Sequence, residues 1–171
     1  MTLDPRPDRG ALSPAAALAV VAGAMALTAW SGQKFSPTPE HPRTRRWYQM
    51  LDKPGFTPPD PAFGAAWGAI ELVLGYGGYR LLRQRSSPAR DAAVGLWALN
   101  NLLIAGWSGL FFGRRALGPS ALAAGGMIAV AGGYAATATK IDKAAAATAL
   151  PLMGWLGFAT LLAEEVWRRN D

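Results

Sequence analysis

Tryptophan is the side chain in this sequence whose number and placement most suggest a binding site. Seven tryptophans occur in 171 residues, and Trp67, Trp107 and Trp155 lie inside apolar stretches. An indole in such a stretch can face lipid, pack in a core, or line a pocket for a flat apolar ligand while its N–H group seeks a polar partner. Position alone leaves these three possibilities open.

The residue types exclude most conventional active sites. The sequence has no cysteine, which excludes disulfides, iron–sulfur clusters and thiolate metal sites. Its one histidine, His41, could ligate a haem iron, but it has no second ligand nearby and we expect a solvated loop residue. The sequence has no Ser-His-Asp set, no metal-spaced cluster and no glycine-rich phosphate loop. We therefore predict no metal site and no acid–base or nucleophilic catalysis.

The distribution of charged residues predicts the helices that position the tryptophans. The chain is 51% hydrophobic and 16% charged, against about 25% charged in a typical soluble domain. Residues 10–33, 92–113, 116–139 and 144–163 contain no charged side chain, and 61–79 contains only Glu71. Each run matches the roughly 20 residues that a helix needs to cross a bilayer. The sequence therefore predicts an all-α membrane protein, a five-transmembrane-helix bundle.

The predicted organisation is a polar N-terminal tail, residues 1–13, followed by one domain, residues 14–170. The five spans are expected at about 14–33, 62–82, 91–112, 117–139 and 144–167. Loop 1, residues 34–61, is the longest connection. Small residues recur every four positions from Ala121 to Gly133, a stripe that allows close packing either within the bundle or between two copies.

The basic residues point to a membrane rather than to nucleic acid. The net charge is +6 and the isoelectric point is near 10.2. Lysine and arginine concentrate in the short connections between spans, where they anchor a protein to lipid headgroups. We therefore predict membrane lipids and no nucleic acid as partners. Nearly equal numbers of basic residues on the two sides leave the orientation open.

Residues 47–59 read WYQMLDKPGFTPP, which resembles the signature W-Y-x-x-L-x-K-P-x-[WF]-x-P-P of the TspO/translocator protein family, the tryptophan-rich sensory proteins. A second match, W-x3-F-F-G, runs from Trp107 to Gly113. A third match lies in the last span, where Pro151 and Trp155 are followed by Val166-Trp167-Arg168, which resembles the end of the family pattern. The first motif is specific, and the three together follow the order of the family across residues 14–170.

The resemblance implies a five-helix bundle, often a homodimer, in a bacterial cytoplasmic membrane. Such a protein binds porphyrins, protoporphyrin IX or haem, or sterol-like and drug-like ligands, in a pocket closed by loop 1. No cofactor is obligatory. Some bacterial members are reported to degrade protoporphyrin in light with two pocket tryptophans, which correspond here to Trp67 and Trp155. Other pocket positions correspond to Tyr48, Pro58, Trp107 and Ala159. Without an acid–base set, degradation would rest on photoexcited porphyrin, oxygen and these indoles.

Three functions remain open on this basis. The first is a receptor or sensor that regulates tetrapyrrole or stress physiology by binding porphyrin. The second is a structural subunit that binds another membrane complex and has a degenerate pocket. The third is transport of porphyrin or lipid, although no internal repeat of the usual transporter kind is detectable.

The sequence departs from the family pattern inside the expected pocket. Asn100 replaces a glutamine, Ile104 and Ala163 replace asparagines, and Glu71 replaces an aromatic residue. Glu71 lies one helical turn from Trp67 on the same face, and a carboxylate inside a membrane is costly and usually functional. It could be protonated and hydrogen-bond Asn100 or Asn101, or it could contact a nitrogen or cation of a ligand. We include Glu71 and Asn100 among the expected ligand-binding residues.

Four prolines between Pro54 and Pro61 predict that residues 47–63 are semi-rigid and nonhelical. Proline fixes φ and removes a backbone donor, so this segment cannot extend the helix that follows it. We expect its aromatic side chains to cover the mouth of the bundle.

Overall fold

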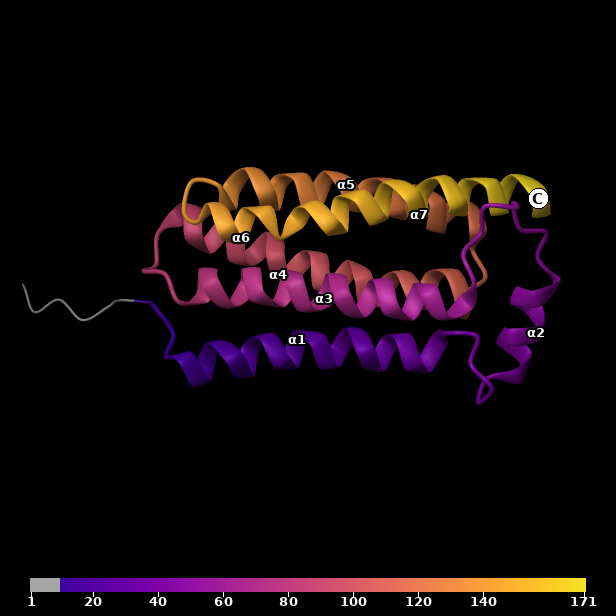
Figure 1. Cartoon of the computed structure of the whole chain (residues 1–171), viewed down its shortest axis with the longest axis horizontal. Helices are drawn as coiled ribbons and strands as arrows, with labels where there is room; N and C mark the ends of the chain where they lie inside the picture. The colour runs from indigo at the N-terminus through magenta and orange to yellow at the C-terminus, as the bar shows by residue number, and fades with distance from the viewer. Residues whose placement is uncertain (1–9) are drawn as a thin grey trace, which may run out of the picture.

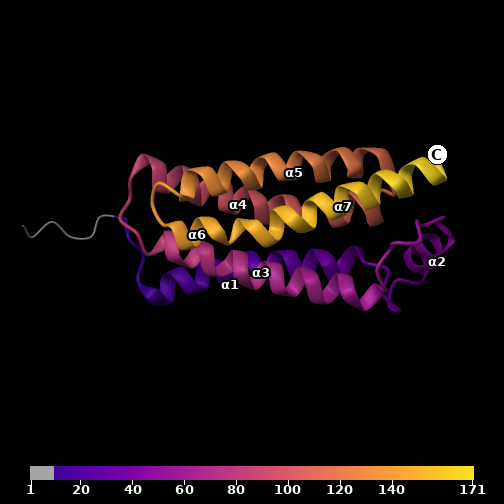
Figure 2. The same cartoon turned by 45° about the horizontal axis from the view of Figure 1, so that its top comes forward.

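The computed structural model describes residues 10–171, and in that range the chain forms helices and no strand. Most of the predicted polar tail, residues 1–9, lies outside the described residues. Five long helices lie side by side along the long axis of the bundle, and α2 lies across one end (Figures 1 and 2). The elements are α1 (Pro14–Phe35), α2 (Pro42–Met50), α3 (Asp60–Leu82), α4 (Pro88–Ser108), η1 (Gly109–Gly113), α5 (Leu117–Ala138), α6 (Lys143–Ala147) and α7 (Ala149–Asn170).

Proline and serine mark the starts of the long helices. Pro14 and Pro88 occupy the first turns of α1 and α4, where the missing N–H group is not needed. Ser13 and Ser87 precede them, and each hydroxyl group accepts a hydrogen bond from the backbone N–H group of the third residue of its helix, Ala16 or Arg90. These local signals explain why the predicted boundaries lie close to the observed ones.

The last predicted span is two helices, α6 and α7, that meet at Thr148. The break has a local cause. Pro151 lies in the first turn of α7, and a proline ring conflicts with the carbonyl group four residues earlier, here that of Ala147. Ala147 is accordingly the last residue of α6.

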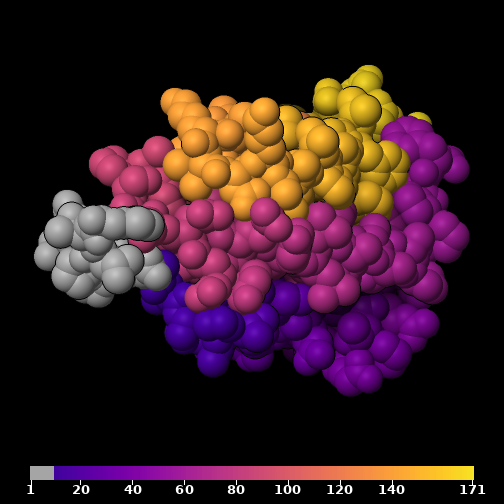
Figure 3. All heavy atoms as spheres, turned by 60° about the vertical axis from the view of Figure 1, so that its left-hand side comes forward, coloured from indigo at the N-terminus to yellow at the C-terminus, as the bar shows by residue number. Residues whose placement is uncertain are grey.

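Four helical segments within residues 10–171 are long and apolar enough to cross a membrane: Pro14–Phe35, Pro88–Gly113, Leu117–Ala138 and Lys143–Asn170. The remaining predicted span, the second in the chain, corresponds to α3. This helix has 23 residues but is not apolar enough to be counted with the other four. Glu71, Arg80 and several glycines lower its mean hydropathy. The surface of α3 nevertheless lies between that of α1 and those of α6 and α7 (Figure 3).

The end of the bundle near α6 is closed by glycines that let large side chains approach the α3 backbone. A Cβ atom on Gly77 would collide with the side chains of Thr148 and Tyr134, and one on Gly78 would collide with the Trp97 ring. The Tyr134 hydroxyl donates to Ala145 O (2.9 Å), and Trp97 Nε1 donates to Leu74 O (3.0 Å). Large side chains of α4 and α5 therefore pack directly against the α3 backbone at this level.

The small-residue stripe on α5 is used within the bundle. Ala121 is buried, Gly125 lies against the Thr160 methyl group of α7, and Gly133 lies against Leu96 of α4. Of the positions in the stripe, Ala129 is exposed. Most of the stripe therefore serves packing inside one molecule.

Asp142 fastens the connection between α5 and α6 to α3. Its carboxylate accepts bonds from the backbone N–H groups of Ala144 and Ala145 and from Arg80 Nε (2.8 Å). Burial alone would raise the pKa of Asp142, but these donors together hold the pKa below its ordinary value. The ionised carboxylate is therefore the form that this connection stabilises.

Candidate ligand-binding site

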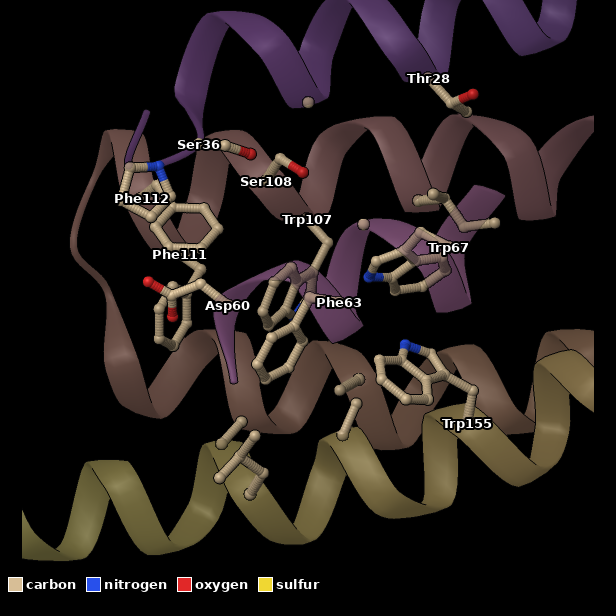
Figure 4. A pocket seen from close by; sticks show the side chains of 18 of the residues that line it. Thr28, Ser36, Asp60, Phe63, Trp67, Trp107, Ser108, Phe111, Phe112 and Trp155 are labelled. Atoms are coloured by element: carbon tan, nitrogen blue, oxygen red, sulfur yellow. The ribbon is translucent and has the colours of Figure 1, made fainter. Parts of the chain in front are cut away.

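A cavity of about 640 Å³ lies in the half of the bundle near α2, and all five long helices contribute to its wall (Figure 4). Its lining runs along α3 from Asp60 to Glu71 and stops there, while α3 continues to Leu82. The closed packing around Gly77 and Gly78 begins beyond this point. The cavity therefore occupies one half of the bundle and ends inside it.

Tryptophans from α3 and α7 form one wall of the cavity. The Trp67 and Trp155 rings meet edge to face, with centroids 6.1 Å apart and planes inclined by 80° (Figure 4). Phe63 contacts Trp155 in the same way at 5.9 Å. Edge-to-face pairs are a favoured geometry for aromatic rings, so this wall presents a stable aromatic surface to the cavity.

A second aromatic group comes from the end of α4 and from η1. Trp107 stacks on Phe111 with centroids 4.9 Å apart and planes inclined by 15°, and Phe112 lies edge-on to both rings. The π-helical turn Gly109–Gly113 widens the helix here, and both Phe111 and Phe112 line the cavity although they are neighbours in sequence. The Trp107 N–H group donates to Ser120 O (2.9 Å), which fixes the orientation of its ring.

The indole nitrogen of Trp155 differs from that of Trp107. Trp155 Nε1 is buried and has no hydrogen-bond partner within residues 10–171. A buried donor without a partner costs free energy, of the order of 1–3 kcal/mol. Trp155 therefore carries an unpaired N–H group on a side chain that lines the cavity.

Loop 1, residues 36–59 in the structure, covers the α2 end of the cavity. The proline-rich motif predicted a nonhelical segment, and this prediction was wrong in part. Residues Pro42–Met50 form α2, which includes Trp47 and Tyr48. Pro42 begins this helix, and neither proline nor glycine interrupts the eight residues that follow it. Of the predicted nonhelical segment, residues 47–63, only residues 51–59 have no helix, and they carry three of the four clustered prolines. The fourth, Pro61, lies in the first turn of α3. Edge contacts of Trp47 with Phe111 and of Tyr48 with Phe112 hold α2 against η1.

Two further contacts fix loop 1. Lys53 Nζ donates to Tyr48 O (2.6 Å) and lies 4.4 Å from the centroid of the Tyr48 ring, a cation–π contact. Asn170, near the end of α7, exchanges two hydrogen bonds with the backbone of Asp52: Asp52 N donates to Asn170 Oδ1, and Asn170 Nδ2 donates to Asp52 O, both at 2.9 Å. Asn170 lies beyond the predicted end of the last span, and sequence reasoning missed it.

Six of the eight predicted ligand-binding residues line the cavity: Tyr48, Trp67, Glu71, Trp107, Trp155 and Ala159. The structure places Pro58 outside the lining, although its neighbours Thr57 and Asp60 belong to it. Asn100 also lies outside the lining. It is fully buried one turn deeper on α4 than Ile104, which does line the cavity, and its side chain donates to Leu96 O (2.9 Å).

Glu71 does not hydrogen-bond Asn100 or Asn101, which was one of the two roles that the sequence left open for it. The side chains of Asn100 and Asn101 donate instead to the carbonyl groups of Leu96 and Trp97 on their own helix. The Glu71 carboxyl group lies beside the hydroxyl of Thr28 on α1. Thr28 also lines the cavity and was missed, although a polar residue in an apolar stretch is the same signal that identified Glu71.

The histidine and the acidic residues do not form a metal centre in the part of the chain that the structure describes, where no group of three or more potential ligands lies together. His41 precedes α2, and its Nδ1 lies 3.0 Å from the Thr38 hydroxyl. The site is therefore an aromatic cavity with a few polar groups, which is the usual composition of a small-molecule pocket.

A family model described as the TspO/MBR family matches residues 14–168. This chain belongs to the TspO/MBR family. It is 33% identical to human translocator protein over 135 residues, which cover 76% of this chain and 78% of the human protein. It is 28% identical to protein CrtK of Rhodobacter capsulatus over 158 residues, which cover 86% and 88% of the two chains. A translocator protein homolog of Schizosaccharomyces pombe is 26% identical over 126 residues, or 70% of this chain and 75% of the yeast protein.

Membership of the TspO/MBR family and the four apolar helices identify this chain as a multi-pass integral membrane protein. The family match begins at the start of α1 and ends two residues before the last residue of α7, so it includes every element that lines the cavity.

Proposed function

We propose that this TspO/MBR family protein binds flat, apolar ring compounds of the porphyrin type, such as protoporphyrin IX or haem, in the cavity beneath loop 1. The observation that carries the proposal is the facing pair Trp67 and Trp155 in a cavity of about 640 Å³. That volume lies within the roughly 300–1,000 Å³ of small-molecule sites. Binding there would make the protein a sensor or receptor of tetrapyrrole or related apolar ligands.

The proposed membrane arrangement has five spans, with α3 as the second. Its 23 residues are enough to cross the bilayer, and α3 packs between α1 and α6. The charge of Glu71 is compatible with a membrane-spanning α3, because Glu71 lines the cavity. The proposed location is a bacterial cytoplasmic membrane, supported by the long alignment with CrtK of Rhodobacter capsulatus.

The test is a titration of purified protein in phosphatidylcholine nanodiscs with protoporphyrin IX and with haemin. The shift of the porphyrin Soret band reports binding independently of the tryptophans. Trp67→Phe and Trp155→Phe should each weaken binding about fivefold, since an aromatic pair contributes about 1 kcal/mol beyond its buried area. Trp30→Phe is the matched control, because Trp30 is 56% exposed and does not line the cavity.

Saturable binding that weakens in the two cavity variants and not in Trp30→Phe supports the proposal. Binding that is unchanged in all three variants would place the ligand elsewhere. No saturable binding at all would favour the structural role, in which the family fold persists without a working pocket.

The same complexes test whether the protein degrades porphyrin in light. Trp67 and Trp155 are the two indoles that the family resemblance suggests for such chemistry, which would need photoexcited porphyrin and oxygen. Illumination in air should bleach the Soret band faster in the parent protein than in Trp67→Phe or Trp155→Phe. Equal bleaching in all samples, or bleaching equal to that of free porphyrin in empty nanodiscs, would reject a photochemical role.

A further inference from the structure

Glu71 is an acidic group at the deep end of a mostly apolar cavity, and the other acidic residue of the lining, Asp60, lies at the opposite end, at the start of α3. It lies one helical turn after Trp67 on α3 and beside Thr28 of α1. Figure 4 shows Thr28, Trp67 and Trp155 on one side of the pocket, and Ser36 and Phe112 on the other. The carboxyl group therefore lies at the inner end of the cavity, away from loop 1.

The protein supplies no cation to this carboxyl group. Within residues 10–171, no ion pair joins Glu71 to a lysine, arginine or histidine. Lys53 is the one basic side chain in the cavity lining, and its amino group is bound to Tyr48 O and to the Tyr48 ring at the loop 1 end. The neighbouring Thr28 hydroxyl donates to Met25 O (2.9 Å), a backbone carbonyl of its own helix.

A carboxylate in low-dielectric surroundings is stable only when it is paired or hydrogen-bonded. A cation held between Glu71 and the face of the Trp67 indole would satisfy both groups, since an indole face also attracts positive charge. The apolar walls formed by Trp155, Phe63 and Ile104 suit the uncharged body of the same ligand.

We propose that Glu71 influences ligand specificity, and that among flat aromatic compounds of similar size and shape the cavity prefers those that carry a positively charged nitrogen. The inference rests on the proposed function, because it assumes that the cavity binds ring compounds. It narrows that class: among rings of equal size and shape, the cationic member binds more tightly because its charged edge reaches Glu71.

The test compares 9-aminoacridine with acridine. The two rings have the same three-ring frame, but at neutral pH the first carries a proton and a positive charge, whereas the second is uncharged. Affinities are measured by probe fluorescence in nanodiscs of zwitterionic phosphatidylcholine, and displacement by protoporphyrin IX identifies binding in the cavity. The parent protein should bind 9-aminoacridine about tenfold more tightly than acridine, as expected for a hydrogen bond to a charged group.

Three variants separate the carboxylate from other effects. Glu71→Gln should reduce the preference to within about twofold while leaving the affinity for acridine nearly unchanged, since only the charged contact is lost. Glu71→Asp keeps the charge and should keep most of the preference. Glu164→Gln makes the same change on the exposed surface of α7, outside the cavity lining, and should leave the preference intact.

Failure of this inference can be distinguished from failure of the proposed function. Equal affinity of the parent protein for the two acridines, with protoporphyrin IX still bound, overturns the role of Glu71 and leaves the cavity as a ligand site. This measurement needs no variant, so it holds even if Glu71→Gln does not fold. A preference that survives in folded Glu71→Gln likewise overturns the inference. If protoporphyrin IX and both acridines fail to bind, the proposed function itself is wrong.

Discussion

Tyr48 lies where loop 1 meets the cavity, and its surroundings favour the protonated hydroxyl group. Its ring is edge-on to Phe112 and carries the Lys53 amino group at 4.4 Å from its centroid. Burial, and then the negative charge of Asp60, raise the pKa of Tyr48 to about 12 from an ordinary value of 10.0. Because burial raises its pKa, ionisation of Tyr48 is coupled to the packing of loop 1 against the helices beneath it.

We predict that Tyr48 ionises about two pH units later than an exposed tyrosine. The pKa in the folded protein is higher than that in the unfolded chain, so the contribution of Tyr48 to stability is complete below pH 10 and is lost as the pH rises towards 12. Tyrosinate absorbance, taken as the difference between the parent protein and Tyr48→Phe, measures the midpoint. A midpoint near 10 would show that loop 1 does not bury this ring.

Individual residues also show what the sequence could predict about the site. Tyr48, Trp67, Trp107 and Trp155 were identified because each belongs to a motif with several fixed neighbours. Asn100 does not line the cavity, and the sequence could not show this, because motif spacing specifies the face of a helix but not the depth at which a cavity ends. That depth depends on contacts between distant residues, such as Gly78 with Trp97, which one sequence does not reveal.

The contact between α7 and loop 1 operates at the scale of elements. Asn170 is the last residue of α7 and binds the Asp52 backbone through two hydrogen bonds. These bonds join the last turn of one helix to the proline-rich segment over the cavity. Opening of loop 1 must break both of them.

Asn170→Ala should therefore accelerate ligand exchange. Each lost hydrogen bond contributes about 1 kcal/mol, so the association and dissociation rates of protoporphyrin IX should rise several-fold, with a smaller change in Kd. Stopped-flow absorbance at the Soret band measures both rates. Asp171→Ala, one residue further along the chain and exposed, serves as the control. Unchanged rates in Asn170→Ala would show that ligands do not enter past this contact.

The close approach of α3 to its neighbours also gives an element-scale prediction. Gly77→Ala would push a methyl group into Thr148 and Tyr134, and overpacking of this kind costs about 1–3 kcal/mol. A thermal melt in detergent should show Tm lower by about 2–4 °C for each kcal/mol. Gly126→Ala in α5 is the matched control, since its added Cβ meets nothing within 4 Å. Equal Tm values for the two variants would contradict close packing at Gly77.

The elements differ in how well the sequence predicted them. The long helices were found because charge-free runs and helix-starting prolines mark them locally. α2 was missed because a helix of nine residues is too short to be stable alone, and this one relies on contacts of Trp47 and Tyr48 with η1. The break at Thr148 was missed although Pro151 is visible in the sequence, since proline is common in the first turn of a helix.

At the scale of the whole molecule, the number of spans can be measured directly, because the chain contains no cysteine. Arg43 in α2 and Ser86 after α3 are both exposed. If α3 spans the membrane, single variants Arg43→Cys and Ser86→Cys should react with a membrane-impermeant maleimide from opposite sides of sealed, oriented vesicles. Labelling of both from the same side would mean that α3 does not cross, and that the molecule has four spans.

The closed packing at the α6 end limits what the molecule can do with a bound compound. A compound beneath loop 1 meets a wall of Trp97, Tyr134 and Leu74 before it reaches the far side of the bundle. Under the proposed function, such a compound would leave by the half of the molecule through which it came, past loop 1 or between the helices around it. The protein would then sample one compartment and its adjoining lipid leaflet, and the number of occupied molecules would report the concentration on that side alone.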